Sequence, residues 1–471
     1  MPVVSLVLMF GLAVWAAVFM LRGSLLAGCL AAVLAITCFG PHFASFDAGP
    51  LTLSLDRVAL IGLLAMYAFH RWLGWTEAKP MLAGDWLTLA FVGLLIPSTF
   101  SSDWNTSLPK EATPVWRLLS GYLVPLMIYW VARQARKEDR DLDWVHGTFA
   151  LLGVYLAVTG ICEVHRQWWL VFPKHIADPS IGLHFGRARG PMLMAVSYGL
   201  CVGIALLAAW VWSRRFELGS RLIFLSSIPL YLAGVYYSYT RSVWMGVVAA
   251  LGAVAWFSVR GAWRGLLALV VVAGTVAMGA AGLGDRVVNI QREESSGESR
   301  GSAYLRLVFA HVSWRMFQDR PIVGAGFGQF PVAKIPYLSE RVEGMDLQWI
   351  RLLCHHNTFL SLLTETGIAG LSLFVAMMVS WGVHAWRLWS DAGASRAVRG
   401  QGLLMLGVLI LYMCQLMFHE LSYQATDNVL VFFLAGVTMG SRPTSKVITE
   451  KVRARSSESR AMLGLSPALT H

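Results

Sequence analysis

Two adjacent histidines and an asparagine lie where a polar stretch meets a long hydrophobic one. His355, His356 and Asn357 directly precede an apolar segment that begins near residue 358. An imidazole with its unperturbed pKa of about 6.5 can take a proton from a hydroxyl group at neutral pH. Neighbouring histidines point to different sides of a regular backbone and rarely bind one metal ion together, so we expect no metal site here. His356 is thus a candidate general base, although a histidine with a satisfied hydrogen bond at the start of a helix is the simpler explanation when His356 is taken alone.

Arginines occupy two other junctions between polar and apolar stretches. Arg187 and Arg189 end one polar stretch, and Arg241 lies in a very short turn between two apolar segments. Their guanidinium groups present a fixed fork of N–H donors that matches phosphate oxygens. A contact with lipid head groups explains any single arginine at such a place equally well. Three arginines and a histidine on one face of a protein predict a shared anionic ligand.

Composition indicates which elements hold these residues in place. Of the 471 residues, 56% are hydrophobic and only 14% are charged. This is more apolar surface than one soluble core can bury, so the sequence predicts an all-α integral membrane protein. Because roughly 20 apolar residues cross a bilayer as a helix, we expect about 12–13 transmembrane helices. The predicted spans are 2–21, 24–39, 58–74, 83–99, 116–132, 144–163, 192–212, 222–239, 242–258, 265–281, 358–386, 400–418 and 428–440.

Basic residues concentrate in every other loop between these spans. The loops that contain them lie near 133–140, 214–221, 260–264 and 387–399. Such alternation marks the cytoplasmic side of a membrane protein. The loops that hold Arg187, Arg241 and His356 therefore face outward. The net charge of +11 reflects this orientation, and we expect no nucleic-acid partner.

The order of spans and loops predicts four regions. They are 1–281 with about ten N-terminal spans, 282–357 as a long outward loop, 358–440 with the C-terminal spans, and 441–471 as a cytoplasmic, disordered tail. Between residues 285 and 351 the loop has nine basic and eight acidic residues, a balance that argues against an arm that binds polyanions. Within the loop, 302–317 has apolar residues at helical spacing beside Arg306. This stretch predicts an amphipathic helix on the membrane surface or on the bundle.

Two polar residues belong to the segment that follows the histidines. Asn357 lies at its start, and Glu365 falls inside the predicted span. An acid within a span needs a partner or a wet cavity. Both side chains are candidates for orienting a bound substrate. A helix cap for Asn357 and a buried polar contact for Glu365 are the simpler alternatives.

Four motifs, taken in order, resemble a known family. They are R-x-x-G-P at 187–191, T-R-x-x-W-x-G at 240–246, P-x-x-G-x-G-x-x-x-F at 321–330 and H-N-x-x-L-x-x-x-x-E-x-G-x-x-G-L at 356–371. Their order, with a long outer loop just before the histidine motif, resembles the O-antigen ligase and O-antigen polymerase superfamily. The resemblance covers roughly residues 180–440.

The resemblance implies a glycosyltransferase of the bacterial inner membrane whose active site faces the periplasm. Such an enzyme takes a glycan from undecaprenyl diphosphate, and it uses no metal or cofactor. The acceptor is lipid A core, another lipid-linked glycan or a protein, in the synthesis of surface polysaccharide or lipopolysaccharide. Membrane lipids surround the enzyme and its donor.

The family's functional residues map onto the matching positions of this sequence. The essential histidine corresponds to His356, and the essential arginines correspond to Arg187 and Arg241. Arg189 is a possible substitute for Arg187, and Arg306 resembles a further family arginine in the loop helix. After the Gly-Pro pair at 190–191 the sequence reads Met-Leu-Met-Ala-Val-Ser where the family often has Asn-Pro. The choice between ligase and polymerase, and therefore the acceptor, stays open.

Two other classes of function remain as alternatives. A multi-span transporter of polysaccharide or lipid would use Glu365, Glu420 and the outer arginines as a translocation path, with ionisable groups near the middle of several spans. Here these groups gather at the outer ends of the helices, which favours a surface-facing site. A structural assembly protein would tolerate loss of the arginines and of His356.

Overall fold

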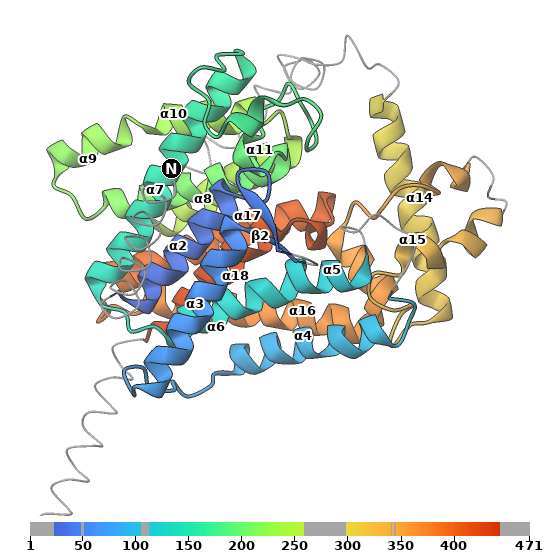
Figure 1. The fold of residues 1–471 in the computed structure, drawn as a ribbon, viewed down its shortest axis with the longest axis horizontal. Coiled ribbons are helices and arrows are strands. Elements are labelled where there is room, and N and C mark those ends of the chain that lie inside the picture. Colours follow the sequence, from blue (N-terminus) through green and yellow to red (C-terminus); the bar gives the residue numbers. More distant parts are fainter. Residues whose placement is uncertain are drawn as a thin grey trace, which may run out of the picture.

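A computed structural model of the protein describes residues 23–48, 51–104, 113–258, 298–340, 342 and 345–442. The predicted spans 2–21 and 265–281 lie outside these residues, as does the tail after residue 442. Helices dominate the described part of the chain, which confirms the predicted all-α fold class (Figure 1). Two short antiparallel strands, β1 (Ser45–Ala48) and β2 (Leu51–Ser54), form a hairpin with Ser45 opposite Ser54.

The described helices up to residue 258 follow one another along the chain, and the stretch 165–194 forms a long connection between two of them. They are α2 (Leu25–Cys38), α3 (Leu55–Trp72), α4 (Ala83–Phe100), α5 (Pro114–Leu118), α6 (Val124–Gln134), α7 (Asp139–Val164), α8 (Ala195–Ser213), α9 (Leu218–Leu225), α10 (Ile228–Tyr237) and α11 (Arg241–Ser258). A π-helical turn at Leu119–Leu123 joins α5 to α6. The later helices are α14 (Glu298–Asp319), α15 (Phe330–Ala333), α16 (Thr358–Ser390), α17 (Arg396–Phe418) and α18 (Ala425–Gly440).

Seven helical stretches in the described residues are long and apolar enough to cross a membrane. They are α4, the continuous stretch from α5 to α6, α7, α8, α11, α16 and α17. Each coincides with a span predicted from the sequence. The helices α2, α10 and α18 are apolar but shorter. The described chain is thus a multi-pass membrane protein by the length and composition of its helices.

The sequence prediction of one span over 222–239 is wrong. The structure has two helices there, α9 and α10, which are separated at Ser226 and Ser227. Pro229 follows directly and has no N–H to donate to the carbonyl of Leu225, which favours a break in the helix at this point. Instead, Ser227 donates its hydroxyl to the carbonyl of Phe224, at 2.6 Å.

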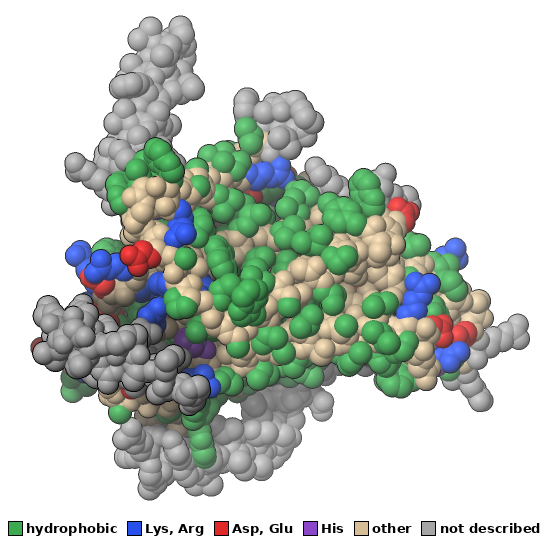
Figure 2. All heavy atoms as spheres, turned by 90° about the horizontal axis from the view of Figure 1, so that it is seen from below, with side chains coloured by type: hydrophobic (Ala, Val, Ile, Leu, Met, Phe, Trp, Pro, Cys, Tyr) green, Lys and Arg blue, Asp and Glu red, His purple; other side chains and the backbone are tan. Residues whose placement is uncertain are grey.

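The long helix α16 lies on one side of the bundle, where Val379 and Val383 are exposed. It packs against α17 and α4, while α6 packs against α18 (Figure 1). The face drawn in Figure 2 is covered by hydrophobic side chains in the middle and carries charged side chains at two opposite ends. This distribution is typical of a protein with an apolar belt in the bilayer and polar ends in water.

The described loops that are predicted to be cytoplasmic meet at one end of the bundle, which we call the basic end. The predicted loop at 260–264 lies outside the described residues. At the basic end, Lys79 donates its Nζ to the carbonyls of Ala135 and Gly440, at 2.7 and 3.2 Å. Arg396 donates to the carbonyl of Arg214 at 3.0 Å. The helices α6, α8 and α18 end here, and α17 begins here. We call the opposite end, where α16 and α11 begin and α17 ends, the histidine end.

The described part of the long loop has a small hydrophobic core of its own. Four of the five predicted apolar residues of α14 are buried in it, namely Val308, Phe309, Val312 and Met316. Their partners come from later in the loop and are Phe330, Leu338, Leu347 and Ile350. The predicted amphipathic helix is therefore confirmed, and its apolar face packs on the rest of the loop. Figure 1 shows α14 and α15 beside one end of α16.

The glycine-rich segment near residue 324 packs into a kink in α16. Gly367 has φ 64° and ψ −165°, which interrupts the helix and frees nearby backbone groups. The loop satisfies them, because Gly326 N–H donates to the carbonyl of Glu365 at 2.9 Å and Ile368 N–H donates to the carbonyl of Pro321 at 2.8 Å. A side chain on Gly324 would meet the backbone of Glu365 at 2.4 Å. These contacts fix the loop against the first turns of α16.

Candidate active site

The start of α16 and the turn after α17 are joined through one hydroxyl group. Thr358 donates its Oγ1 to the carbonyl of His419 at 2.8 Å and accepts the N–H of Leu421 at 3.0 Å. The Nε2 atom of His419 lies 2.9 Å from Oγ of Ser242, in the first turn of α11. Three segments far apart in the sequence thus meet at the histidine end.

His356 lies immediately before this junction and keeps an exposed side chain. Its ring stands edge-on to Phe309 of α14, with the centroids 5.5 Å apart. Crowding by neighbouring chain lowers the pKa of His356, and the positive charge of Arg306 lowers it further. A histidine with a lowered pKa is mainly neutral at neutral pH, which is the state that accepts a proton.

A second imidazole, that of His419, lies close to His356. Burial lowers the pKa of His419 to about 3, and the charges of His356, Arg306 and His184 act in the same direction. Its ring therefore stays neutral throughout the physiological range. The hydroxyl of Ser242 that contacts this ring also donates to Oε1 of Gln415, at 3.0 Å. This network holds the His419 ring in a fixed orientation.

Arg241 and Arg306 lie close enough for their charges to interact, although 65 positions separate them in the sequence. The Arg306 guanidinium lies over the Phe418 ring, 5.1 Å from its centroid. Partial burial lowers the pKa of Arg306, and the charge of Arg241 contributes to the same shift. Both side chains have exposed surface. Among the described residues neither arginine forms an ion pair, so two like charges face one region without a neutralising acid.

Arg187 belongs to the same end through the loop that precedes α8. The N–H of Ala188 donates to the carbonyl of Tyr237 at 2.9 Å, which ties this loop to the end of α10. His184 of the same loop has a pKa lowered by burial and by the charges of Arg187 and Arg189. The charge of His184 in turn lowers the pKa of His419. The structure therefore brings the predicted residues His356, Arg241, Arg306 and Arg187 to one end of the bundle.

Arg189 differs from Arg187 in its surroundings. Its side chain is fully buried and pairs with Glu163 at 3.1 Å. The remaining donors reach the carbonyls of Ile181, Ile176 and Asp178, at 2.5, 2.9 and 2.7 Å. Because its N–H groups bind the protein itself, this geometry does not favour the predicted contact of Arg189 with substrate. It favours a positioning role for the loop that carries Arg187.

Asn357 has the geometry of a helix cap. Its Oδ1 accepts the N–H of Leu360 at 3.0 Å, and its Nδ2 donates to the carbonyl of Met417 at 2.9 Å. The first contact satisfies a backbone donor at the start of α16 that has no partner within the helix. The second ties α16 to α17. Asn357 thus positions the neighbouring His356, and substrate binding by its amide stays a prediction.

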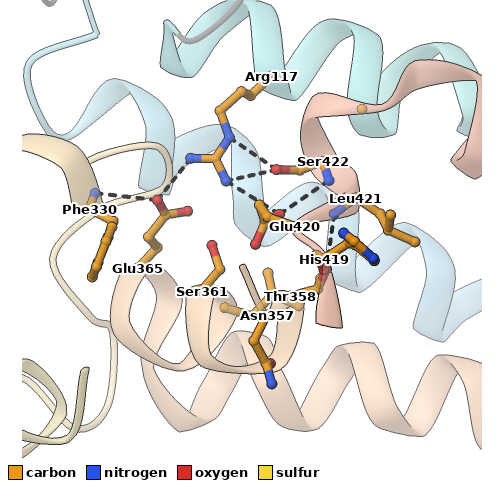
Figure 3. Close-up of polar contacts among 12 residues, drawn as sticks. Arg117, Phe330, Asn357, Thr358, Ser361, Glu365, His419, Glu420, Leu421 and Ser422 are labelled. Atoms are coloured by element: carbon orange, nitrogen blue, oxygen red, sulfur yellow. Dashed lines mark hydrogen bonds and ion pairs between the residues drawn. The ribbon is translucent and has the colours of Figure 1, made fainter. Parts of the chain in front are cut away.

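Glu365 takes part in a buried polar cluster around Arg117 (Figure 3). Arg117 Nη1 donates to Oε1 of Glu365 at 2.8 Å, and its Nε and Nη2 donate to Oγ of Ser422 at 3.0 and 2.7 Å. The second carboxylate, that of Glu420, lies 3.6 Å from Nη2. The Phe330 N–H also donates to Glu365, at 3.3 Å. Arg117 of α5 is therefore linked to α16 and to the turn after α17. Glu365 extends the cluster to the start of α15, which follows the glycine-rich segment.

His355 differs from His356 in burial, although the rings of both stand against Phe309. His355 is buried, its Nε2 lies 3.0 Å from Oγ of Ser313, and its ring is 3.9 Å from that of Phe330. It holds α14 against the end of the loop. Within the described residues, no group of three His, Cys, Asp or Glu side chains is arranged to hold a metal ion.

Comparison with known families adds independent evidence. Residues 222–375 match the family model described as O-Antigen ligase. Residues 222–375 are therefore similar to an O-antigen ligase domain. This match confirms the resemblance to the O-antigen ligase and polymerase superfamily that the motifs suggested. No curated protein matches the chain.

The O-antigen ligase domain contains part of the site. Arg241, Arg306 and His356 lie within the matched residues, whereas Arg187 precedes them and His419 follows them. The fold brings Arg187 and His419 to the domain through the contacts of α8, α10 and α17. The site of this O-antigen-ligase-type membrane protein is therefore assembled from more of the chain than the matched region.

Sequence reasoning missed three residues of this region. His419 follows a span directly, in the same short outward turn as Glu420, and its place at a helix end next to a second polar residue was an available signal. His184 shares a loop with Arg187. Arg117 lies inside an apolar span, where a charged residue usually needs a partner, and this signal was also present.

Proposed function

We propose that this protein is an integral-membrane glycosyltransferase that transfers a glycan from undecaprenyl diphosphate to an acceptor hydroxyl on the periplasmic side. The observation that carries the proposal is the pair Arg241 and Arg306, two guanidinium groups without an acid between them, beside the neutral imidazole of His356. Such a site suits a reaction in which an anion develops as a hydroxyl loses its proton.

The arginines bind and stabilise the leaving group. When the bond between the sugar and the diphosphate breaks, negative charge grows on the departing oxygen. Guanidinium groups held in place before the reaction stabilise that charge more than they stabilise the ground state. Arg241 and Arg187 have this role in our proposal, and Arg306 binds the diphosphate beside Arg241. Glu365 and Asn357 support the site by positioning α16.

His356 accepts the proton of the acceptor. The acceptor oxygen forms a new bond to the anomeric carbon while the bond to the diphosphate breaks, and the hydroxyl proton passes to the His356 ring. The diphosphate leaves on its lipid with its negative charge held by the arginines. Because the pKa of His419 is low, its ring carries no positive charge at neutral pH. The base His356 is neutral as well.

The location of the site follows from the distribution of basic residues. The basic end gathers the arginine-rich loops, so we assign it to the cytoplasm and the histidine end to the periplasm of the bacterial inner membrane. In this arrangement 282–357 is a periplasmic loop between the N-terminal spans and those of 358–440. The donor arrives in the outer leaflet, and the acceptor is lipid A core, a lipid-linked glycan or a protein.

The test is glycan transfer by the purified full-length protein in nanodiscs with an undecaprenyl-diphosphate-linked glycan. We expect His356→Ala and Arg241→Ala to abolish the new glycosidic bond while both variants keep the unfolding midpoint of the wild type. His311→Ala, which changes a half-buried histidine of α14, is the matched control and should transfer normally. Wild-type transfer by either site variant would remove the assignment. Movement of the lipid across the bilayer without a new bond would favour the transporter alternative.

The acceptor is identified in cells that lack the gene. A ligase mutant keeps long chains away from the lipid A core, whereas a polymerase mutant leaves single repeats attached to it. Gel profiles of the surface glycan distinguish these two outcomes. Complementation with His356→Ala should reproduce the profile of the mutant.

A further inference from the structure

A hollow at the basic end, far from the candidate active site, is lined by four arginines. Its volume is about 480 Å³, and its walls include Arg214, Arg221, Arg396 and Arg399 together with Val211 and Trp389. These residues come from the end of α8, from α9, from the end of α16 and from the start of α17. We call this hollow the arginine pocket. Its size lies within the range of about 300–1,000 Å³ that is usual for small-ligand sites.

Two of the four pocket arginines donate to backbone carbonyls. Arg396 uses Nη1 to reach the carbonyl of Arg214 at 3.0 Å, and Arg399 uses Nε to reach the carbonyl of Trp389 at 3.1 Å. Each of these contacts uses one of the five N–H donors of a guanidinium group. The Nε of Arg221 is buried without a hydrogen-bond partner among the described residues. Donors are thus fixed around a space that the described side chains do not fill.

Two carboxylates at the basic end are engaged in other contacts. Asp143 pairs with Arg215 at 2.9 Å, and Asp139 accepts the hydroxyl of Ser395 at 2.6 Å. No acidic residue is among the described residues that line the pocket. Burial lowers the pKa of Arg214, and the positive charges of Arg221, Arg399 and Arg396 lower it further. The positive-inside bias explains arginines at this end, but it does not explain why four of them line one hollow.

The arginine pocket lies at the ends of candidate spans, where a membrane surface is expected. The helices α8, α16 and α17 are candidate spans, and the pocket lies at their basic ends. Trp389 and Val211 give it an apolar wall on the side of the bundle. Tryptophan is typical of the level at which lipid head groups meet hydrocarbon. Basic pockets between helices at this level are suited to the phosphates of anionic lipids.

We propose that the arginine pocket is a binding site for a phosphate group, carried either by the head group of an anionic phospholipid or by free inorganic phosphate. A phosphate has several oxygens that accept hydrogen bonds from different directions, so it can contact guanidinium groups from three helices at once. A single carboxylate neutralises less of the charge that the four arginines bring together. The site is separate from the candidate active site, because it lies at the other end of α16 and α17.

The test measures binding to the full-length protein in detergent after lipid removal. One arm titrates short-chain phosphatidylglycerol, the second titrates inorganic phosphate, and short-chain phosphatidylcholine is the zwitterionic comparison; native mass spectrometry counts the bound molecules. We expect one tight site in the wild type and an affinity weaker by about tenfold or more in the double variant Arg214→Gln with Arg399→Gln. Arg399→Lys, which keeps the charge but loses the fork, should weaken binding by a smaller factor.

The matched control removes the same charge from the same end. Arg136 and Arg387 are exposed and do not line the pocket. The double variant Arg136→Gln with Arg387→Gln should bind as the wild type does. Binding of both phosphatidylglycerol and phosphate, in competition, would show that the pocket recognises phosphate alone, and binding of the lipid only would identify the head group as the source.

Either of two results would overturn the proposal. One is equal weakening in the pocket and control variants, which would indicate a general effect of charge. The other is unchanged binding in the pocket variant. If the double variant fails to fold, judged by its unfolding midpoint, Arg399→Lys decides the question by the same comparison. This readout does not depend on glycan transfer.

Discussion

Thr358 and His419 lie 61 positions apart and are joined by a hydrogen bond of 2.8 Å from the Thr358 hydroxyl to the His419 carbonyl. The same hydroxyl accepts the N–H of Leu421. The start of α16, which carries His356, is therefore fixed to the turn that carries His419 and Glu420. In the proposed enzyme this contact sets the distance between the two imidazoles.

Replacing Thr358 by valine tests this contact. The change keeps the shape of the side chain but leaves the buried N–H of Leu421 without a partner, which costs about 1–3 kcal/mol of unfolding free energy. We expect a lower unfolding midpoint and slower glycan transfer. Thr358→Ser retains the hydroxyl and should recover most of both. A Thr358→Val protein with wild-type stability and transfer would show that the hydroxyl does not hold the two segments together.

The pH dependence of transfer tests the role of His356. The base must be neutral to accept a proton, so transfer declines as the pH falls through its pKa. Because burial and Arg306 lower that pKa, we expect the acidic limb of kcat/KM below the ordinary value of about 6.5. Arg306→Gln removes a positive charge and should move the limb to higher pH, in addition to any loss of rate. Arg315→Gln, on the same helix, should leave it in place; a limb unmoved by Arg306→Gln would contradict the assignment.

Substitution of Arg241 tests the binding of the diphosphate. Loss of one preorganised donor to a developing anion typically slows the chemical step about 10²–10³-fold. We expect a loss of this order in kcat for Arg241→Ala, and a smaller loss for Arg241→Lys, which keeps the charge without the fork. Single-turnover rates with saturating donor make the measurement. An effect confined to KM of the acceptor would place Arg241 on the other substrate.

The cluster around Arg117 predicts a large effect on stability. Removal of Arg117 leaves the carboxylates of Glu365 and Glu420 buried side by side, and the loss of one partner from a buried ion pair costs about 3–5 kcal/mol. We expect Arg117→Ala to lower the unfolding midpoint strongly in detergent. The double variant Arg117→Ala with Glu365→Gln removes one of the two charges and should recover part of the loss. An unchanged midpoint in Arg117→Ala would show that the cluster does not stabilise the fold.

Local sequence pattern was sufficient to predict much of the fold of this protein. Runs of apolar residues predicted all seven long spans of the described chain, because a helix in a bilayer must be apolar over its whole length. Helical spacing predicted α14. The alternation of basic loops predicted that His356, Arg187 and Arg241 lie on the same side of the membrane, because each span carries the chain to the opposite side. The break between α9 and α10 was missed, because hydropathy averages over Pro229.

Only the tertiary structure decided which polar residues meet and what they do. Arg117 and Ser422 are 305 positions apart, and no local pattern links them. Arg187 and Arg189 look equivalent in the sequence. In the structure Arg189 is buried against Glu163 and binds its own loop. Arg187 lies at the histidine end. From the sequence by itself the long apolar helices and the end of the bundle at which each one ends could be predicted, because both depend on hydropathy and on the order of the spans along the chain. The partners of each charge were decided by the packing of helices, because burial and distance exist only once those helices have come together.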